Sequence, residues 1–524
     1  MKRILALVLS LLMMASVALA DTSILNTESI MPVVTRPITL KVACSIHPAH
    51  TDYNEMYMWQ TYADMTGINI DWDITPDATW TERKNLLLNS NDLPDVLLRS
   101  KITNIEAANY GADQGLLIDL SPMLEEYAPN LTALMDQYPE IRPALTIDGG
   151  IYTLPLIIPA NGPRTRAIWI NEEWLEKCNL EMPTTLEEFY DMLIAFKNCD
   201  WNGNGAMDEY PIAWNSGCDV DMFSSFAGIF GCATLGSASG WFDLDAEGNT
   251  RFYPISDRYK EMLSFLNKLW KEGLIDTDSL TQSSAQLIVK ADDGLVGVCP
   301  VLNGPYFLGN DAANFVAMPA LTNAWGERMW TNANNCVQGF GTAAITCDCE
   351  NPEAALRWLD YFYSDDGVIL LMYGTEGYTF EYDENGKPVY TELVMDSSLG
   401  LTTDQLTGRF LPCASSNLPL IQLPELAYDI TNPIEFRRQE MGSILEEYTV
   451  ETLWSPNFTA DEARELSSLS TDLDTYVKEM RLKFMTGDAD LDTEWDSFVK
   501  TLKDMGMARY MAIYTEAYNR AYGK

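Results

Sequence analysis

The chain has 524 residues, with 76 acidic side chains against 34 basic ones and a formal net charge of −42. Such an acidic balance argues against nucleic acid and anionic membrane surfaces as partners, because both attract basic surfaces. The hydrophobic fraction is 47 %, so the chain can bury a large core and is too long for one compact unit; two domains are expected.

The N-terminus has the pattern of a secretory signal over residues 1–20. Two basic residues precede an apolar run over 4–17, and small residues at 18–20 precede Asp21. The run is shorter than the roughly 20 residues of a membrane-spanning helix, so cleavage is expected. The first cysteine is Cys44, so a lipid-modifiable cysteine is not expected at the mature N-terminus. The sequence predicts a secreted protein that is extracellular or associated with the cell surface.

Residues 21–36 are polar and without periodicity, which predicts a flexible leader. After it, runs with strand periodicity alternate with runs of helical periodicity. This alternation predicts a wound α/β sheet, in which ligands lie beyond the C-terminal ends of the strands. His47 and Arg99 follow the first and third strands. In chain order the predicted segments are strand 38–44, helix 56–67, strand 68–74, helix 80–88 and strand 93–98.

The later part of the chain continues the mixed pattern and then becomes helical. Thr185 and Glu188 have the spacing of a capping box at the start of a helix. A helix over 259–270 is expected to end at Gly273. Further predictions are a strand over 166–170, a helix starting with a cap and a proline at 351–352, and helices over 471–522 broken near Gly487 and Gly506.

A single segment, residues 200–211, has the spacing of a calcium loop. Its oxygen donors could surround a hard cation that takes about six to eight oxygens, and Gly205 permits the tight bend. The helix-loop-helix calcium pattern needs a glutamate at the twelfth position, where Pro211 stands, and no second copy occurs, so a paired sensor is disfavoured. The competing interpretation is an Asn/Gly-rich turn that binds nothing. The candidate ligands are Asp200, Asn202, Asn204, the carbonyl of Ala206, Asp208 and Glu209.

Other metal sites and a disulfide scaffold are not predicted. Ten cysteines are a low density for an exported chain of this length, and their spacing gives no connectivity. His47 and His50 lack the companion residues of a zinc site.

Several short segments, in this order, carry a family resemblance. They are 169–175 (WINEEWL), 183–189 (PTTLEEF), the calcium loop, 271–276 (KEGLID), 351–355 (NPEAA), 373–377 (YGTEG), 494–496 (EWD) and 516–520 (EAYNR). The chain resembles extracellular solute-binding proteins (family 1) of carbohydrate ABC transporters, in the subgroup of lipoproteins and alginate-oligosaccharide-binding proteins.

The resemblance implies a two-lobed α/β fold like that of periplasmic binding proteins, with a hinge, a central cleft and a helical C-terminal region. It implies that the first lobe comprises 37–150 and 312–377 and the second 151–311 and 378–524. The chain would cross near Gly149–Gly150, Gly309 and Gly377, and the lobes would close on a sugar. It also implies that the loop holds a structural Ca²⁺ ion, through the six candidate ligands, away from the sugar.

The sugar-binding residues are expected where aromatic faces and polar planar groups meet at strand ends or hinge loops. For each single aromatic, a place in the core is the competing interpretation. Arg99, Arg164 and Arg166 could pair with a uronate carboxylate, or neutralise part of the acidic surface. The candidates are His47, Arg99, Arg164, Trp214, Trp330, Asn332 and Tyr373.

The leading hypothesis is a non-catalytic, monomeric receptor that captures an oligosaccharide and delivers it to the permease subunits of an ABC importer. The alternative is a secreted carbohydrate-active enzyme with a structural calcium site, for which 76 acidic residues make any carboxylate pairing uninformative. The absence of G-x-S-x-G, H-E-x-x-H and phosphate-loop motifs removes several hydrolase and nucleotide-binding classes. A calcium-stabilised adhesion protein is disfavoured by the α/β alternation and the lack of repeats.

Overall fold

The computed structural model describes residues 24–90, 92–159, 167–234, 240–245, 247–301, 308–331, 336–401, 403–412, 417–423, 426, 433–449 and 457–522. The predicted signal at 1–20 and the candidates Arg164 and Asn332 lie outside these residues. The chain divides into two compact units. The first contains residues through Ile157 and Gly339–Ile421, and the second contains Ile158–Gln338 and the residues from Gln422 onward.

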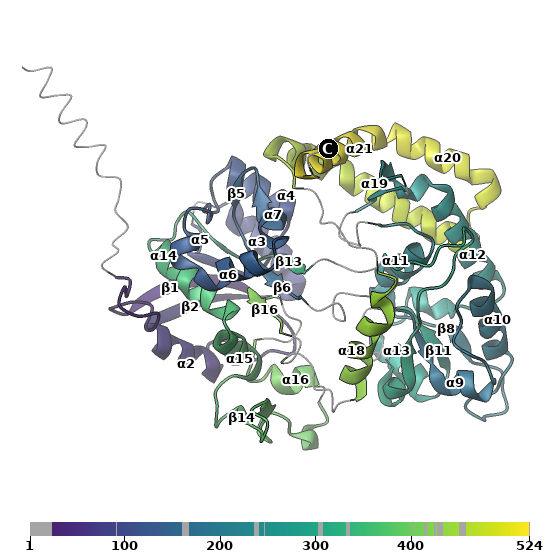
Figure 1. The fold of residues 1–524 in the computed structure, drawn as a ribbon, viewed down its shortest axis with the longest axis horizontal. Helices are drawn as coiled ribbons and strands as arrows, with labels where there is room; N and C mark the ends of the chain where they lie inside the picture. Colours follow the sequence, from purple (N-terminus) through teal and green to yellow (C-terminus); the bar gives the residue numbers. More distant parts are fainter. Residues whose placement is uncertain are drawn as a thin grey trace, which may run out of the picture. The chain divides into compact units, whose positions relative to one another are not determined.

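The first unit is built on a six-stranded mixed sheet with the order β16-β6-β13-β3-β1-β2 (Figure 1). The predicted strand-helix alternation is confirmed, because β1 pairs in parallel with both β2 and β3. β13 then runs antiparallel to β3. The strands are β1 (Ile38–Ile46), β2 (Ile68–Pro76), β3 (Val96–Ile102), β6 (Leu154–Ile157), β13 (Val337–Ile345) and β16 (Leu420–Ile421).

Helices cover this sheet and bury an aromatic cluster. The Trp59 ring on α2 lies 6.0 Å from that of Trp358 on α14, and the Tyr62 hydroxyl donates to the Trp358 carbonyl at 2.6 Å. The main helices of the first unit are α2 (Tyr57–Thr66), α3 (Trp80–Leu88), α6 (Pro129–Gln137), α7 (Ile141–Leu145), α14 (Pro352–Asp360), α15 (Asp365–Tyr373) and α16 (Thr403–Thr407). Two short hairpins join them, β4 (Thr146–Ile147) with β5 (Gly150–Ile151) and β14 (Phe380–Tyr382) with β15 (Pro388–Tyr390).

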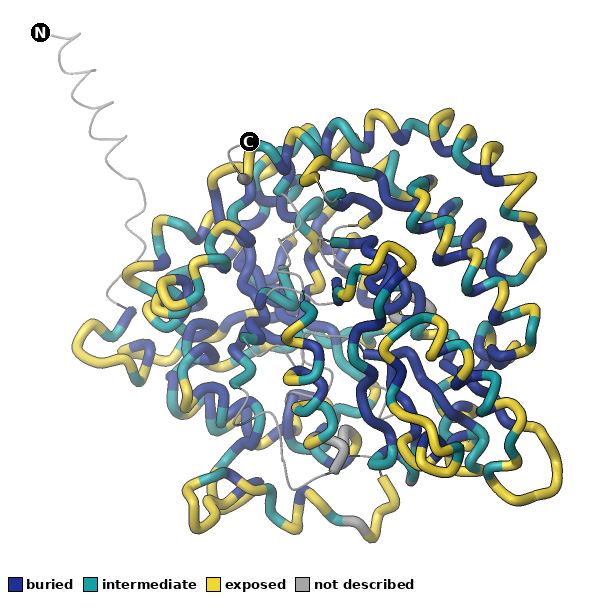
Figure 2. Tube along the Cα trace, turned by 45° about the vertical axis from the view of Figure 1, so that its right-hand side comes forward, coloured by how far each residue is buried: buried dark blue, intermediate teal, exposed yellow. Residues whose placement is uncertain are grey.

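The second unit has a four-stranded sheet of order β12-β7-β11-β8. β8 is parallel to β11, whereas β7 is antiparallel to both β11 and β12. In the tube of Figure 2, buried residues gather inside and exposed residues follow the outer turns of the trace. The strands are β7 (Trp169–Asn171), β8 (Tyr210–Ile212), β11 (Val296–Cys299) and β12 (Phe315–Ala317), with a separate hairpin of β9 (Phe242–Leu244) and β10 (Thr250–Phe252).

Local capping residues determine where helices of the second unit begin and end. The Thr185 hydroxyl accepts from the Glu188 amide at 3.1 Å, which confirms the predicted capping box of α10. The predicted end of α12 is also confirmed, because Gly273 has a φ of 62°. The helices are α9 (Glu172–Lys177), α10 (Leu186–Lys197), α11 (Asp219–Ile229), α12 (Asp257–Lys271), α13 (Ser284–Asp292) and α18 (Pro433–Glu446).

The C-terminal helices close the second unit. They are α19 (Ala460–Thr486), α20 (Leu491–Asp504) and α21 (Met507–Tyr522), and the predicted breaks at Gly487 and Gly506 are confirmed by φ values of 84° and 97°. α19 starts earlier than predicted, because Thr459 and Glu462 form another capping box. The Asn267 amide of α12 donates to the carbonyls of Phe484 and Met485 at 2.9 and 3.1 Å, which fastens α19 to α12.

The unit boundaries differ from the predicted lobe boundaries. Gly149 and Gly377 have φ values of 87° and 74°, but both lie in turns inside the first unit, and Gly309 lies inside the second. These predicted crossings are wrong. The chain changes unit near residues 157, 338 and 421 instead, because β6, β13 and β16 all belong to the six-stranded sheet.

Two smaller predictions are also corrected. Residues 24–36 are not a flexible leader: Leu25 pairs with Val34, and both side chains are buried against the first unit. Asn351 precedes α14, and Pro352 occupies its first turn as predicted, but the Asn351 side chain makes no capping hydrogen bond. Among the described residues, no helix combines the length and apolar character needed to cross a membrane.

Candidate ligand and calcium sites

The segment predicted to bind calcium lies between α10 and β8 in the second unit. The Asp200 carboxylate accepts from the amides of Asn204 at 3.1 Å and Gly205 at 2.8 Å. The Asn204 side-chain oxygen accepts from the Ala206 amide at 2.7 Å. Gly205 has a φ of 86°, which confirms the predicted bend. The loop is therefore curled around oxygen acceptors.

Glu209 provides a test of whether this loop suits a cation. Its side chain is only 6 % exposed, and Oε1 accepts from the Trp201 amide at 2.6 Å. Oε2 is buried and has no hydrogen-bond partner among the described residues. A buried carboxylate oxygen without a partner is costly, and a bound cation would remove that cost.

The donor types in the loop also suit a hard cation. Asp200, Asn202, Asn204 and Asp208 are exposed, and all offer oxygen. Within the described residues, no three His, Cys, Asp or Glu side chains gather as a metal site. The loop instead alternates carboxylates with amides, and the Asn204 amide nitrogen lies 3.2 Å from both Asp208 oxygens. The residues fit a structural Ca²⁺ ion that would be held by side-chain oxygens and the Ala206 carbonyl.

In the first unit, the predicted sugar residue His47 follows the C-terminal end of β1. Arg99 does not follow the third strand as predicted but lies within it, because β3 continues to Ile102. His47 follows β1 and is half-buried, and its Nδ1 accepts from the Ala49 amide at 3.2 Å. Arg99 is fully buried, with a φ of 49°, and donates to the Pro412 carbonyl at 3.2 Å. Arg99 thus has a structural role inside the first unit, whereas His47 is partly accessible to solvent.

Charged groups surround this strand edge. Lys101 forms an ion pair with Asp77 at 3.0 Å, and the guanidinium of Arg99 lies 3.8 Å from the same carboxylate. Burial acts to raise the pKa of Asp77, but hydrogen bonds from Ser45 and Lys101 and the charges of Lys101 and Arg99 outweigh it, so the pKa lies below its ordinary value. The Asp77 carboxylate therefore stays ionised at neutral pH.

The three predicted aromatic residues within the described parts are buried. Trp214 and Trp330 are fully buried in the second unit, and the Trp214 carbonyl accepts from Gln282 at 2.7 Å. Tyr373 ends α15, with its ring 4.9 Å from that of Tyr390. Each of these three residues therefore lies in the core, which was the alternative to a role in sugar binding.

A pocket that was not predicted lies in the second unit beside α19. Its volume is about 130 Å³. Arg481 is 6 % exposed, and its guanidinium lies 4.1 Å from the Phe223 ring centroid and 5.9 Å from that of Trp241. Its Nε is buried, and no residue in the described parts of the chain hydrogen-bonds to it. The pocket is lined by Phe223, Ser224, Ala227, Ala233, Gly240, Trp241, Tyr253, Tyr259, Asp474, Lys478 and Arg481.

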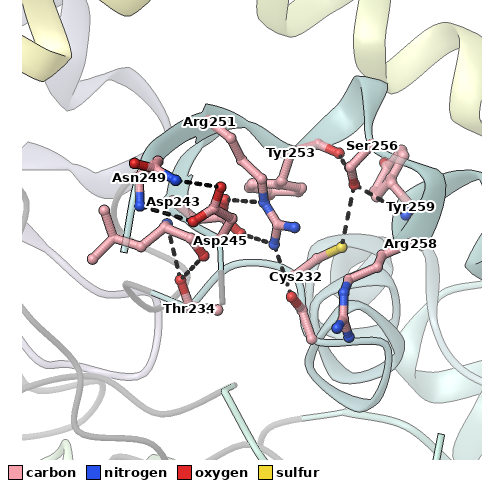
Figure 3. A network of polar contacts seen from close by, with 12 residues as sticks. Cys232, Thr234, Asp243, Asp245, Asn249, Arg251, Tyr253, Ser256, Arg258 and Tyr259 are labelled. Atoms are coloured by element: carbon pink, nitrogen blue, oxygen red, sulfur yellow. Dashed lines mark hydrogen bonds and ion pairs between the residues drawn. The ribbon is translucent and has the colours of Figure 1, made fainter. Parts of the chain in front are cut away.

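An ion pair between Arg251 and the fully buried Asp243 lies close to Trp241 in the sequence (Figure 3). Arg251 on β10 donates from Nε at 2.7 Å and from a terminal nitrogen at 2.8 Å to Asp243 on β9, and also to the Gly231 carbonyl at 2.8 Å. Burial raises the pKa of Asp243 in spite of Arg251. Burial also raises the pKa of Tyr259 to about 12, so this wall residue keeps its hydroxyl proton.

One sequence signal could have indicated this pocket. Arg481 falls on the apolar stripe of α19 that contains Val477 and Phe484, where a charged residue is unexpected. Trp241 gives no comparable signal. The pocket's other members come from α11, η5 (Tyr253–Ile255), α12, α19 and the connecting residues Ala233 and Gly240. Only the fold brings them together.

Comparison with known proteins agrees with this architecture. FusA of Streptococcus pneumoniae serotype 4, a fructooligosaccharide ABC transporter substrate-binding protein, is 26 % identical over 501 residues, which are 92 % of this chain and 90 % of FusA. YtcQ of Bacillus subtilis, a polygalacturonan/rhamnogalacturonan-binding protein, is 23 % identical over 472 residues, 86 % of each chain.

The solved structures show the same fold. FusA in complex with kestose superimposes with a TM-score of 0.76 at 25 % identity, over 93 % of this chain and 100 % of FusA. A FusA EF-hand mutant with fructo-nystose has a TM-score of 0.75 at 24 % identity, over 93 % of this chain and 100 % of the mutant. The alginate-binding protein AlgQ2 without calcium ion gives 0.72 at 23 % identity, over 93 % and 99 % of the two chains. The fold is therefore of the periplasmic-binding-protein class.

Residues 50–369 match the family described as bacterial extracellular solute-binding protein. The chain belongs to this family, as the sequence resemblance predicted. Proteins of this family bind a solute rather than transform it, so the carbohydrate-active enzyme that stood as the alternative is set aside.

Proposed function

We propose that this protein captures an oligosaccharide outside the cell and delivers it to the permease subunits of an ABC importer. The observation that carries the proposal is the match to FusA over 92 % of the chain, together with the fold shared with FusA in its kestose complex. The predicted signal at residues 1–20 would export the protein. Binding would shift the protein toward the conformation that has the higher affinity for the sugar.

The sugar contacts that the structure supports best are Trp241 and Arg481 in the second unit and His47 in the first. An aromatic face beside a guanidinium with a free donor suits a sugar ring, which offers an apolar face and a rim of hydroxyls. His47 has the accessible position beyond a strand end at which α/β sheets bind ligands. Arg164 and Asn332 remain candidates from sequence.

Calorimetric titration with kestose, oligogalacturonides and alginate oligosaccharides tests the proposal. We expect saturable binding of one of these classes, with no shorter saccharide in the sample after prolonged incubation. Binding that is lost in Trp241→Ala but kept in Trp325→Ala, which removes a tryptophan that is 44 % exposed, would support the pocket. Release of shorter saccharides, or no binding to any of the three, would contradict the function.

We also propose that the loop at 200–211 binds a structural Ca²⁺ ion. The support is the buried, unpartnered oxygen of Glu209 and the set of oxygen donors around it. The FusA EF-hand mutant and the calcium-free AlgQ2 structure are consistent with cation sites in similar proteins. When bound, the ion would hold the end of α10 against the start of β8. It would act on the stability of the second unit and leave sugar binding largely unchanged.

A further inference from the structure

Two cysteines meet at the entrance of the calcium loop. Cys178 caps the C-terminus of α9, and Cys199 follows the end of α10, directly before Asp200. Their sulfur atoms are 3.6 Å apart, although 21 positions separate them in the sequence. Both side chains are partly exposed, in contrast to the buried Cys44, Cys232, Cys299, Cys336 and Cys349.

The surrounding packing holds these two cysteines together. The Trp174 and Trp201 rings, from the two segments that carry the cysteines, stack at 4.7 Å with an angle of 10°. Phe196 on α10 packs against the edge of Trp174 at 5.2 Å. The Cys178 amide donates to the Trp174 carbonyl at 3.1 Å. A disulfide, whose sulfurs are about 2 Å apart, therefore requires only a small movement of the two side chains.

We propose that Cys178 and Cys199 form a disulfide bond in the exported protein, and that this bond fixes the entrance of the calcium loop. The extracellular family to which the chain belongs works in a compartment where such bonds persist. The effect on calcium rests on the calcium site proposed above. Because Cys199 is bonded to Asp200, tethering Cys199 restrains the residue whose carboxylate curls the loop.

The oxidant is a low-molecular-weight disulfide such as oxidised glutathione. One cysteine attacks it, forms a mixed disulfide and releases one small thiol; the second cysteine then displaces the other small thiol. Two protein thiols are oxidised to one disulfide, and one small disulfide is reduced to two thiols, which carry the two protons away. Closing the loop between the cysteines restricts the unfolded chain and so stabilises the folded one.

Peptide mapping of the whole mature protein tests the bond directly. After equilibration with oxidised glutathione and alkylation of the remaining thiols, we expect one linked peptide pair containing Cys178 and Cys199, which dithiothreitol separates. Recovery of both cysteines as alkylated thiols, or each joined to glutathione, would overturn the proposal. This measurement requires no variant.

Thermal denaturation tests the consequence. The oxidised protein should melt about 5 °C above the reduced protein. Cys178→Ser should abolish this redox-dependent shift, whereas Cys347→Ser, which removes an exposed cysteine of the first unit, should keep it. A shift of the same size in Cys178→Ser would overturn the proposal.

Calcium titrations of the two redox states separate the disulfide from the calcium assignment. We expect half-maximal calcium stabilisation at a several-fold lower concentration in the oxidised protein. Equal calcium responses in the two states would overturn the link between bond and loop. No calcium response in either state, with the linked peptide present, would refute the calcium site and leave the disulfide standing.

Discussion

The carboxylates of the 200–211 loop differ in their solvent exposure and in the number of hydrogen bonds that they accept. Asp200 is exposed and already accepts two backbone amides, so it shapes the loop with or without an ion. Glu209 is buried, and one of its oxygens accepts no hydrogen bond from the described residues. A bound cation would therefore offset the free-energy cost of burying this oxygen. In the proposed calcium site, Asp200 would therefore shape the loop and Glu209 would supply a buried negative charge.

Calcium should raise the melting temperature of the protein, and Asp200→Ala should remove most of that gain while leaving sugar affinity nearly intact. Ligand at 100 times its dissociation constant stabilises a folded protein by about 2.7 kcal/mol, which is an increase of several degrees. Differential scanning fluorimetry with and without CaCl₂ measures the effect. Asp191→Ala, which removes an exposed carboxylate of α10, is the matched control. An undiminished calcium response in Asp200→Ala would refute the site.

A second prediction at the scale of single residues concerns the contribution of the Asp243–Arg251 ion pair to stability. Asp243→Asn should destabilise the protein by about 3 kcal/mol, because it leaves the charge of Arg251 without its buried partner. Sugar affinity should also fall, since Asp243 lies only two residues after Trp241 in the chain. Urea unfolding followed by tryptophan fluorescence measures the loss. Glu465→Gln breaks an exposed ion pair with Arg509 and should change stability little; equal losses in the two variants would contradict the argument.

Helices of the first unit are joined by capping across elements. Asp360, the last residue of α14, accepts from the backbone amides of Asn130 at 3.1 Å and Leu131 at 2.8 Å, in the first turn of α6. It therefore satisfies amides that α6 cannot pair within itself. Burial raises the pKa of this carboxyl from 3.8 to about 6, in spite of the hydrogen bonds that favour its charge.

This raised pKa predicts a pH dependence of stability. Between pH 4 and 6 the folded protein holds a proton on Asp360 that the unfolded chain has lost, so this contribution to stability is present at low pH and is lost as pH rises through 6. The shift of about two units corresponds to about 3 kcal/mol. Compared with wild type, Asp360→Asn should be more destabilised at pH 4 than at pH 7 by up to this amount.

Urea unfolding at the two pH values measures this difference. Asp136→Asn, which removes an exposed carboxylate from α6, serves as the control and should show the wild-type pH dependence. Parallel pH profiles for wild type and Asp360→Asn would contradict the assignment.

For the whole molecule, the important feature is that the chain passes between the two units three times. Each unit has its own sheet and its own buried core, as independently folding domains do. In such a protein, a few residues at the crossings absorb the change of backbone angles. A ligand that contacts both units then favours the arrangement in which both contacts are made.

We predict that saturating oligosaccharide lowers the radius of gyration measured by small-angle X-ray scattering. Trp241→Ala should require a higher sugar concentration for the same change, because it weakens binding without altering the crossings. Trp325→Ala should behave like wild type. Saturable binding with an unchanged scattering profile would mean that the sugar contacts one unit only.

Much of the local structure could be predicted because neighbouring residues encode it. The helix at 80–88 has the observed bounds of α3, the Thr185–Glu188 box starts α10, and Gly205 bends its loop. Element ends were less accurate: β3 begins at Val96 rather than at residue 93, and α19 begins at Ala460. Such boundaries depend on partners that lie far away in the sequence.

The sequence by itself determined the α/β alternation, the family and the order of oxygen donors in the calcium loop, since each is written in short segments. Only the tertiary structure decided that Trp214 and Trp330 belong to the core, that Arg481 faces Trp241, and that Cys178 meets Cys199. The reason is physical: an aromatic ring or an arginine has the same local pattern in a core and in a pocket. Which of the two it occupies depends on the long-range packing that surrounds it.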